Sequence, residues 1–202
     1  MGRARSFETE DILATTAQLF RRLGFAATSL KDLERETGLQ AGSLYNAFGN
    51  KKAVFLHSLD AYHETVVRYR IERYLKGDNP IAELVDLFTS TYQVEGIPNP
   101  GCLLTNTAAE IGGDDPEIQS KVEEGFSLLR DAFRTQMRKA KQLGLANPAI
   151  PSEAAAEFLL TAYQGLLVRV RNGASLDVLE QTALLTVGVV SRKRIKQSSL
   201  KP

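Results

Sequence analysis

The sequence is poor in the residues that form disulfides and metal sites. It has one cysteine among 202 residues, and its only histidines are His57 and His63. A single cysteine excludes an internal disulfide, which agrees with a reducing compartment. The two histidines are six positions apart, so they fall on different sides of a helix, and no cysteine/histidine cluster is present. We therefore expect no metal site, and we identify no cofactor.

Long apolar runs are also missing. No segment approaches the ~18 apolar residues of a membrane-spanning helix. No apolar stretch of signal-peptide length follows the basic start of the sequence. With 43% hydrophobic residues the chain can still bury a sizeable core. We expect a cytoplasmic protein that has no membrane partner.

The formal net charge is only +1, but the charges are unevenly distributed. Residues 1–52 hold 8 Lys/Arg against 6 Asp/Glu, residues 53–190 hold 12 against 18, and residues 191–202 hold 5 against none. Binding to phosphate groups depends on a local patch of basic side chains and not on the total charge of the protein. The small net charge therefore does not exclude nucleic acid as a partner.

Residues 28–51 read as two short helices joined by a glycine turn. Ser29 is placed to cap the first helix together with Asp32, and Gly38 supplies the left-handed residue that ends it. The second helix is expected from Gln40 or Ala41 to Phe48. Helical spacing puts the apolar side chains of this helix on one face and leaves a small, hydrogen-bonding face, which consists of Gly42, Ser43, Tyr45 and Asn46. Such a face suits the groove of a DNA duplex.

Together with Gly24-Phe25-Ala26-Ala27 before it and Gly49-Asn50-Lys51-Lys52 after it, this block resembles the DNA-binding domain of TetR-type (tetracycline-repressor-like) transcriptional regulators. The resemblance covers roughly the first quarter of the chain. Two positions depart from the family pattern. Leu33-Glu34 stands where Ile-Ala is usual, and Ala47 stands where a His or Tyr commonly precedes the last Phe.

The remaining pattern predicts an all-α fold with nine helices and no strands. The first helix is expected from about Phe7 to Leu23, after a basic arm with Arg3 and Arg5. After the two short helices, further helices are expected from Asn50 to about Leu75, from Pro80 to about Val94, from Cys102 to Ile111, from Pro116 to about Leu143, from Ser152 to about Arg171 and from Ser175 to about Arg194. We expect a helix-turn-helix domain at 1–52, a helical ligand-binding and dimerisation domain at 53–195, and a flexible tail at 196–202.

The last two expected helices carry more apolar side chains than one buried side needs. The resemblance implies that this pair forms a four-helix bundle with the same pair of a second subunit. Judged from the residues alone, burial in the core of a monomer is an equal alternative.

Seven residues are candidate DNA contacts. We expect Asn46 to read an adenine edge, Tyr45 to hold a phosphate, and Lys51 to bind a phosphate at the start of its helix. Gly42 permits close approach to the DNA backbone. The remaining candidates are Ser43 on the same helix and the pair Thr28 and Ser29 at the start of the preceding one.

A second candidate site surrounds the segment that begins at Gly101. Polar groups on this otherwise apolar segment need a partner. One hypothesis is an inducer pocket whose polar lining is Asn106, Thr107 and Glu110 and whose other lining residues are Tyr62, Phe88, Tyr92, Cys102, Phe126 and Tyr163. Another hypothesis is that Cys102 itself senses an oxidant or an electrophile, as an alternative to its being a small buried side chain.

The function that we expect is that of a dimeric, ligand-responsive regulator, most naturally a repressor. Its partners are a palindromic operator in double-stranded DNA and a small-molecule inducer. The alternatives are a redox or electrophile sensor of the same fold and a small helical enzyme. The sequence shows no phosphate loop, no metal-ligand spacing and no Cys-His pairing, so we do not expect an enzyme.

Overall fold

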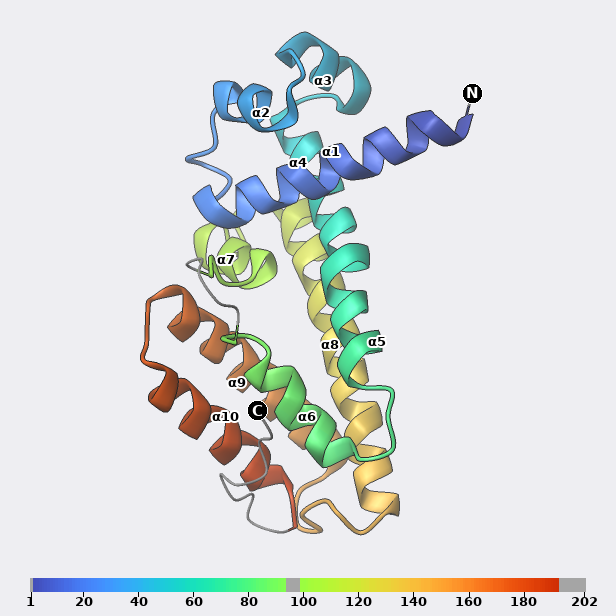
Figure 1. The fold of residues 1–202 in the computed structure, drawn as a ribbon, viewed down its shortest axis with the longest axis vertical. Helices are drawn as coiled ribbons and strands as arrows, with labels where there is room; N and C mark the ends of the chain where they lie inside the picture. Colours follow the sequence, from blue (N-terminus) through green and yellow to red (C-terminus); the bar gives the residue numbers. More distant parts are fainter. Residues whose placement is uncertain (1, 94–98, 193–202) are drawn as a thin grey trace. The chain divides into compact units, whose positions relative to one another are not determined.

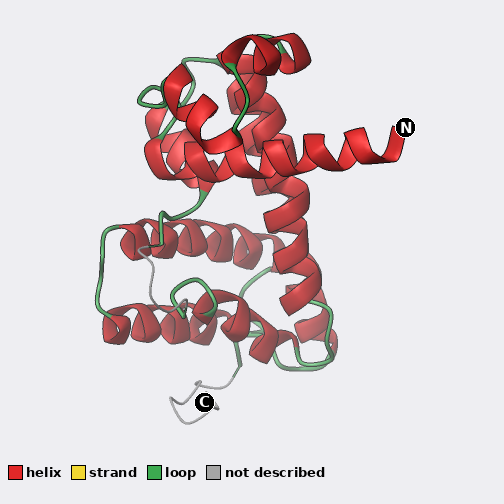
Figure 2. Ribbon diagram, turned by 45° about the horizontal axis from the view of Figure 1, so that its top comes forward, coloured by secondary structure: helices red, strands yellow, loops and turns green. Residues whose placement is uncertain are grey.

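A computed structural model of the protein describes residues 2–93 and 99–192, and in this part the chain is helical (Figures 1 and 2). No strand occurs among the described residues, and Ala146 and Ser191 form an isolated β-bridge. The elements are α1 (Gly2–Leu23), α2 (Leu30–Thr37), α3 (Ala41–Phe48), α4 (Lys51–Tyr62), the π-helix η1 (His63–Arg68), α5 (Tyr69–Tyr74), α6 (Pro80–Thr89), α7 (Leu103–Glu110), α8 (Pro116–Gln142), α9 (Ser152–Arg171) and α10 (Leu176–Val190). Because α4, η1 and α5 follow one another without a break, the described chain has nine continuous helices, which confirms the expected fold class.

The chain forms two compact units. The first comprises Met1–Arg68 and Cys102–Gly125, and the second comprises Tyr69–Gly101 and Phe126–Pro202. The first unit thus holds α7 and the beginning of α8 in addition to the helix-turn-helix segment. Its extent differs from the domain boundary that we expected at residue 52, because α4 and α7 both pack against α1. The tail expected at 196–202 lies outside the described residues.

In the first unit, α1 lies across α4, and α2 and α3 lie near the N-terminal end of α4 (Figure 1). The core between these helices is aromatic. Phe20 and Phe55 are fully buried and meet edge to face with ring centroids 4.8 Å apart, and Phe25 lies 4.9 Å from Phe55. Leu33 and Leu44 are also fully buried, so α2 and α3 are each attached to this core by one leucine.

In the second unit, α9 and α10 lie side by side, and α6 packs against α10 (Figure 1). Phe88, Phe133 and Tyr163 form its central ring cluster, with centroid separations of 5.2 to 6.2 Å. Tyr163 accepts a hydrogen bond from Nε of Arg70 at 2.9 Å. None of the described helices is both long and apolar enough to cross a membrane.

Several helix ends differ from expectation. The chain is already helical from Gly2, so Arg3 and Arg5 belong to α1 and not to an extended arm. Alanine and arginine favour helix, and no proline interrupts the segment. The fifth expected helix ends at Thr89 instead of Val94, and residues 94–98 lie outside the described part. The last helix ends at Val190, because the next two residues turn back to pair with the segment that follows α8.

Candidate nucleic-acid interface

The outer face of α3 is free among the described residues. Gly42, Ser43 and Asn46 are exposed, Tyr45 is half-buried, and Leu44 is fully buried on the opposite side. The helix therefore has the two faces that its sequence predicts. Its outer side offers an open glycine, a hydroxyl, a phenol and an amide, which are groups able to donate to phosphates and to base edges.

Hydrogen bonds fix the starts of the two helices that flank the turn between α2 and α3. Ser29 and Asp32 form the expected capping box at the start of α2, and Gly38 ends α2 with a φ of +69°. Gln40, the residue before α3, makes no capping hydrogen bond through its side chain. Instead Oε1 of Glu34 accepts the backbone N–H of Ala41 at 2.7 Å, so a side chain from α2 caps α3.

Glu34 is a functional residue that sequence reasoning missed, since it was noted only as a departure from the family pattern. Its carboxylate also favours the positive N-terminal end of α3. In the same segment, the hydrogen bonds from Ser29 and the contact with Arg35 lower the pKa of Asp32 to about 2. The carboxylates of Asp32 and Glu34 therefore stabilise the starts of α2 and α3.

Of the candidates before α3, Ser29 stays accessible and Thr28 does not. The Thr28 side chain is buried, and its hydroxyl donates to the carbonyl of Gly24 at 2.5 Å. The hydroxyl of Thr28 is therefore committed to the turn after α1, and we remove it from the set of DNA contacts. Ser29 is exposed at the start of α2.

Lys51 stands at the start of α4, after the N-cap Asn50, whose side chain accepts the N–H of Ala53. Its ammonium lies 4.8 Å above the ring of Phe25 and 3.4 Å from the carbonyl oxygen of Ala26. These contacts hold the charge close to the turn between α1 and α2. Lys51 remains half-buried, with its cation near the start of α2.

Two polar residues of α7 contact this same turn. The carboxylate of Glu110 accepts the backbone N–H groups of Phe25 at 2.9 Å and of Ala26 at 2.7 Å. Nδ2 of Asn106 donates to the carbonyl of Arg21 at 3.0 Å. The end of α1 and the turn into α2 are therefore held by two side chains of α7, and we call this set of contacts the α7 clamp.

A glycine makes the α7 clamp possible. Gly24 has a φ of +86°, and a Cβ built on it would lie 2.7 Å from Oε2 of Glu110. Only glycine combines this left-handed backbone with room for the carboxylate. The backbone N–H groups that follow a left-handed residue form a small anion-binding concavity, which the carboxylate of Glu110 fills.

The other candidates of the second site fall into both units. Tyr62 and Cys102 are brought together in the first unit, where the Tyr62 hydroxyl donates to Sγ of Cys102 at 3.6 Å. Both side chains are buried, and burial raises the pKa of Tyr62. Thr107 is also buried in this unit.

In the second unit, Phe88 and Tyr163 join the ring cluster with Phe133, which sequence reasoning did not select. Tyr92 follows α6, and Phe126 is half-buried on α8. Burial raises the pKa of Tyr92 to about 12, and no described residue accepts or donates a hydrogen bond at its buried hydroxyl.

The helices α9 and α10 each leave large apolar side chains exposed. Phe158 and Val168 stand on α9 with 41% and 49% of their surface exposed, and Val178, Leu185 and Val189 stand on α10 with 40%, 71% and 42%. The α10 residues recur at helical spacing and share one face. We call these five residues the α9–α10 stripe.

Comparisons with known proteins agree with this architecture. The family model described as "Bacterial regulatory proteins, tetR family" matches residues 12–57. The model described as "Tetracyclin repressor-like, C-terminal domain" matches residues 79–183. The two models together span most of the chain.

Similar proteins carry the same kind of description. The HTH-type transcriptional repressor ComR of Escherichia coli K12 is 27% identical over 92% of this chain and 90% of its own length. The uncharacterized HTH-type regulator YezE of Bacillus subtilis 168 is 31% identical over 73% of this chain and 77% of its own. A cysteine mutant of the TetR family regulator CifR, solved with 26-bp operator DNA, is 21% identical, has a TM-score of 0.76, and covers 88% of this chain and 94% of its own.

The α3 face, the capped turn and both family models lead to one conclusion. The chain belongs to the TetR family of DNA-binding transcriptional regulators.

Proposed function

We propose that this protein is a homodimeric, ligand-responsive transcriptional repressor. Two copies of α3 bind successive major grooves of a palindromic operator, and a small molecule bound by the helical C-terminal region releases the DNA. The observation that carries the proposal is the exposed, hydrogen-bonding face of α3 on a turn that hydrogen bonds hold in place. A regulator of chromosomal genes acts in the cytoplasm, where we expect this protein.

The DNA contacts divide into base readout and backbone positioning. Asn46 is exposed on α3 and has the amide that pairs with the N6 and N7 positions of adenine. Tyr45 and Lys51 bind phosphates on one side of the groove, and Ser29 at the start of α2 binds the opposite backbone. Gly42 carries no side chain and meets nothing within 4 Å if a Cβ is added, so the DNA backbone can approach closely. Ser43 completes the contact set.

The α9–α10 stripe supports the dimer. Leu185 exposes 71% of its surface in the isolated chain, and exposed apolar side chains gathered on one face favour burial against a partner. A second copy of the same pair of helices covers the stripe with two-fold symmetry. The dimer then presents two α3 helices to half-sites about one helical turn apart.

We place the inducer in the second unit, near Phe88, Tyr92, Phe126 and Tyr163. The buried Tyr92 hydroxyl, which has no partner among the described residues, suits a polar group of a ligand. In the sequence α6 directly precedes α7, and α7 holds the turn between α1 and α2 through Glu110. A ligand that fits better when α7 is displaced therefore lowers the affinity for DNA.

Cys102 supports a second candidate function, that of an electrophile sensor. It is the residue before α7, so its backbone lies at the positive end of the helix that ends at the α7 clamp. Its thiol would add across the C=C bond of an unsaturated carbonyl compound, with sulfur bonding to one carbon and hydrogen to the other. An adduct at the buried Tyr62–Cys102 contact displaces α7. If Cys102→Ser leaves release by such compounds unchanged, the small-molecule inducer alone accounts for the response.

Fluorescence anisotropy with the DNA upstream of the protein's own coding sequence tests the proposed function. The expected result is binding that weakens by roughly tenfold or more when salt rises from about 50 to about 200 mM, because counterions are released when phosphates are contacted. Binding that does not depend on salt, or no preference for this DNA over a scrambled duplex, would contradict the proposal.

A further inference from the structure

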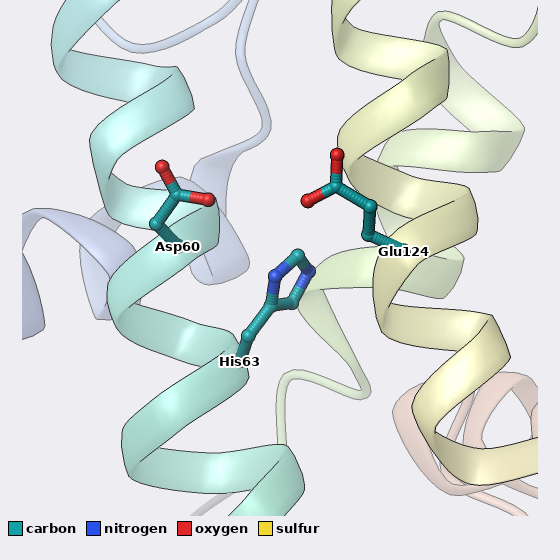
Figure 3. Close-up of side chains that lie close together, drawn as sticks. All are labelled: Asp60, His63 and Glu124. Atoms are coloured by element: carbon teal, nitrogen blue, oxygen red, sulfur yellow. The ribbon is translucent and has the colours of Figure 1, made fainter. Parts of the chain in front are cut away.

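Three side chains with metal-ligating atoms converge in the first unit. Asp60 lies on α4, His63 begins the π-helix η1 three positions later, and Glu124 faces them from α8 (Figure 3). Their ligand atoms all lie within 4.8 Å of one another. Figure 3 shows the imidazole ring projecting into the space between the two carboxylates. We call this group the Asp60–His63–Glu124 cluster.

His63 is buried, with only 5% of its surface exposed, and no described residue forms a hydrogen bond with its Nε2. A buried ring nitrogen without a partner needs an explanation, since buried polar groups are nearly always satisfied. Its close approach to α8 depends on Gly125, where an added Cβ would lie 2.7 Å from Nε2 of His63. Short π-helical segments are also frequent at functional sites.

A cation already belongs to the cluster. Nζ of Lys121 lies 2.8 Å from Oδ1 of Asp60 and 3.1 Å from Oε2 of Glu124. The side chains of Asp60 and Glu124 are 46% and 52% exposed, so an ion in solvent can reach their oxygens. The long side chain of Lys121 can swing out to solvent when another cation takes its place.

We propose that the Asp60–His63–Glu124 cluster is a binding site for one divalent transition-metal ion such as Zn²⁺, which displaces the ammonium of Lys121. One imidazole nitrogen and two carboxylate oxygens form a donor set that suits borderline metals, with solvent completing the coordination. Magnesium and calcium favour oxygen ligands alone, so the histidine distinguishes the site from theirs. This inference does not depend on the proposed regulatory function.

The required movement is small. Two ligand atoms that are each about 2.1 Å from a tetrahedral ion lie about 3.4 Å apart, so atoms that now lie up to 4.8 Å apart must approach by roughly 1.4 Å. Both are partly exposed and have room to turn. The ion would join α4 to the beginning of α8 within the first unit, where Lys121 joins them in its absence.

The same unit contains a matched control. Nζ of Lys52 bridges Asp115 at 2.8 Å and Glu117 at 2.9 Å, which is the same arrangement of one lysine and two carboxylates. No histidine belongs to that group. A comparison of variants in the two groups therefore distinguishes a metal site from an ordinary surface ion pair.

The test is equilibrium dialysis of the full-length protein against Zn²⁺, with DNA and chelating tags absent. The wild type is expected to bind one ion per chain at the cluster. Glu124→Gln keeps the shape of the side chain, removes one charged ligand, and should weaken binding by at least about tenfold. Lys121→Met removes the competing ammonium from two carboxylates and should strengthen binding by up to roughly tenfold.

Two control variants are expected to bind Zn²⁺ as the wild type does. Lys52→Met removes the ammonium of the matched ion pair, and His57→Asn removes the other histidine, which is exposed on α4. Circular dichroism of every variant verifies folding. Because Lys121→Met predicts a gain, the test does not depend on a variant that merely loses binding.

Two results would overturn the proposal. One is Zn²⁺ binding by the wild type that Glu124→Gln and Lys121→Met both leave unchanged, which would assign the ion to other residues. The other is no measurable binding by either the wild type or Lys121→Met, which would make the cluster a structural ion pair only.

Discussion

At the scale of single residues, Asn46 is the side chain on which the proposed base recognition most directly depends. It is exposed on α3 and its amide suits an adenine edge. We expect Asn46→Ala to weaken specific operator binding by about 1–3 kcal/mol and to relax the preference at one base pair of each half-site. Anisotropy titrations on the operator and on single-base variants measure both effects.

Gln119→Ala is the control for this prediction, because it removes an exposed amide from α8 in the same unit. Its operator affinity should equal that of the wild type. If Asn46→Ala lost affinity equally for the operator and for unrelated DNA, Asn46 would be a backbone contact and not a base reader.

Asp32 makes the stability of the capping box depend on pH. Its folded-state pKa is about 2, below the ordinary value of 3.8, first because of the hydrogen bond from the Ser29 side chain. A lowered folded-state pKa gives stability that is present above the unfolded-state value and is lost as pH falls towards the folded-state value. Asp32→Asn should therefore be less stable than the wild type at pH 7, and the difference should shrink between about pH 4 and pH 2.

Urea unfolding of both proteins across this pH range measures the effect. A difference in the free energy of unfolding that stays constant down to about pH 2 would show that ionisation of Asp32 does not contribute.

At the scale of elements, α7 holds the turn between α1 and α2 through the α7 clamp, and this contact is the basis of the proposed coupling. Glu110→Gln leaves one strong acceptor for two backbone N–H groups, those of Phe25 and Ala26. We expect a loss of about 1 kcal/mol in the free energy of unfolding, at the low end for charged hydrogen bonds because Glu110 is exposed. Operator affinity should fall as well, since the turn into α2 loosens.

The matched variant is Asp114→Asn, an exposed carboxylate in the turn after α7 that should change neither quantity. Urea unfolding and anisotropy titration report stability and operator affinity separately. Wild-type operator affinity in Glu110→Gln would contradict the coupling role of α7.

The starts of α2, α4 and α6 were predictable because their signals are local. The N-caps Ser29, Asn50 and Asn79 each accept a backbone N–H within three residues of their own position. Other features depend on residues far apart in the sequence. Glu34 caps α3 from α2, Glu110 reaches a turn more than 80 residues earlier, and no local pattern indicates either contact.

The assignment of second-site residues shows the same limit. The sequence indicated that the polar groups of Asn106, Thr107 and Glu110 need partners, but it did not reveal which groups they contact. In the structure, Asn106 and Glu110 form hydrogen bonds at the end of α1 and in the turn after it. The buried Thr28 hydroxyl donates to the carbonyl of Gly24. The Asp60–His63–Glu124 cluster escaped sequence reasoning because Glu124 is 61 residues from His63 and joins it only in the fold.

At the scale of the whole molecule, the proposed function depends on dimerisation. Leu185 is the most exposed residue of the α9–α10 stripe, at 71%. Leu185→Glu would place a charge at the centre of the proposed interface, where it could not be desolvated without a large penalty. We expect this variant to be a monomer in analytical ultracentrifugation and to bind the operator more weakly.

Leu143→Glu is the matched control, because Leu143 is 53% exposed after α8 and lies outside the stripe. It should sediment as the wild type does. A Leu185→Glu protein that remains a dimer would exclude the stripe as the interface.

The proposed function requires that a dimer present two α3 helices to DNA with two-fold symmetry. Selection of binding sites from a pool of random DNA duplexes with the wild-type protein is the sharpest test of this requirement. We expect an enriched palindrome whose half-sites are about one helical turn or slightly more apart. An enriched sequence without two-fold symmetry, or no enrichment at all, would contradict it.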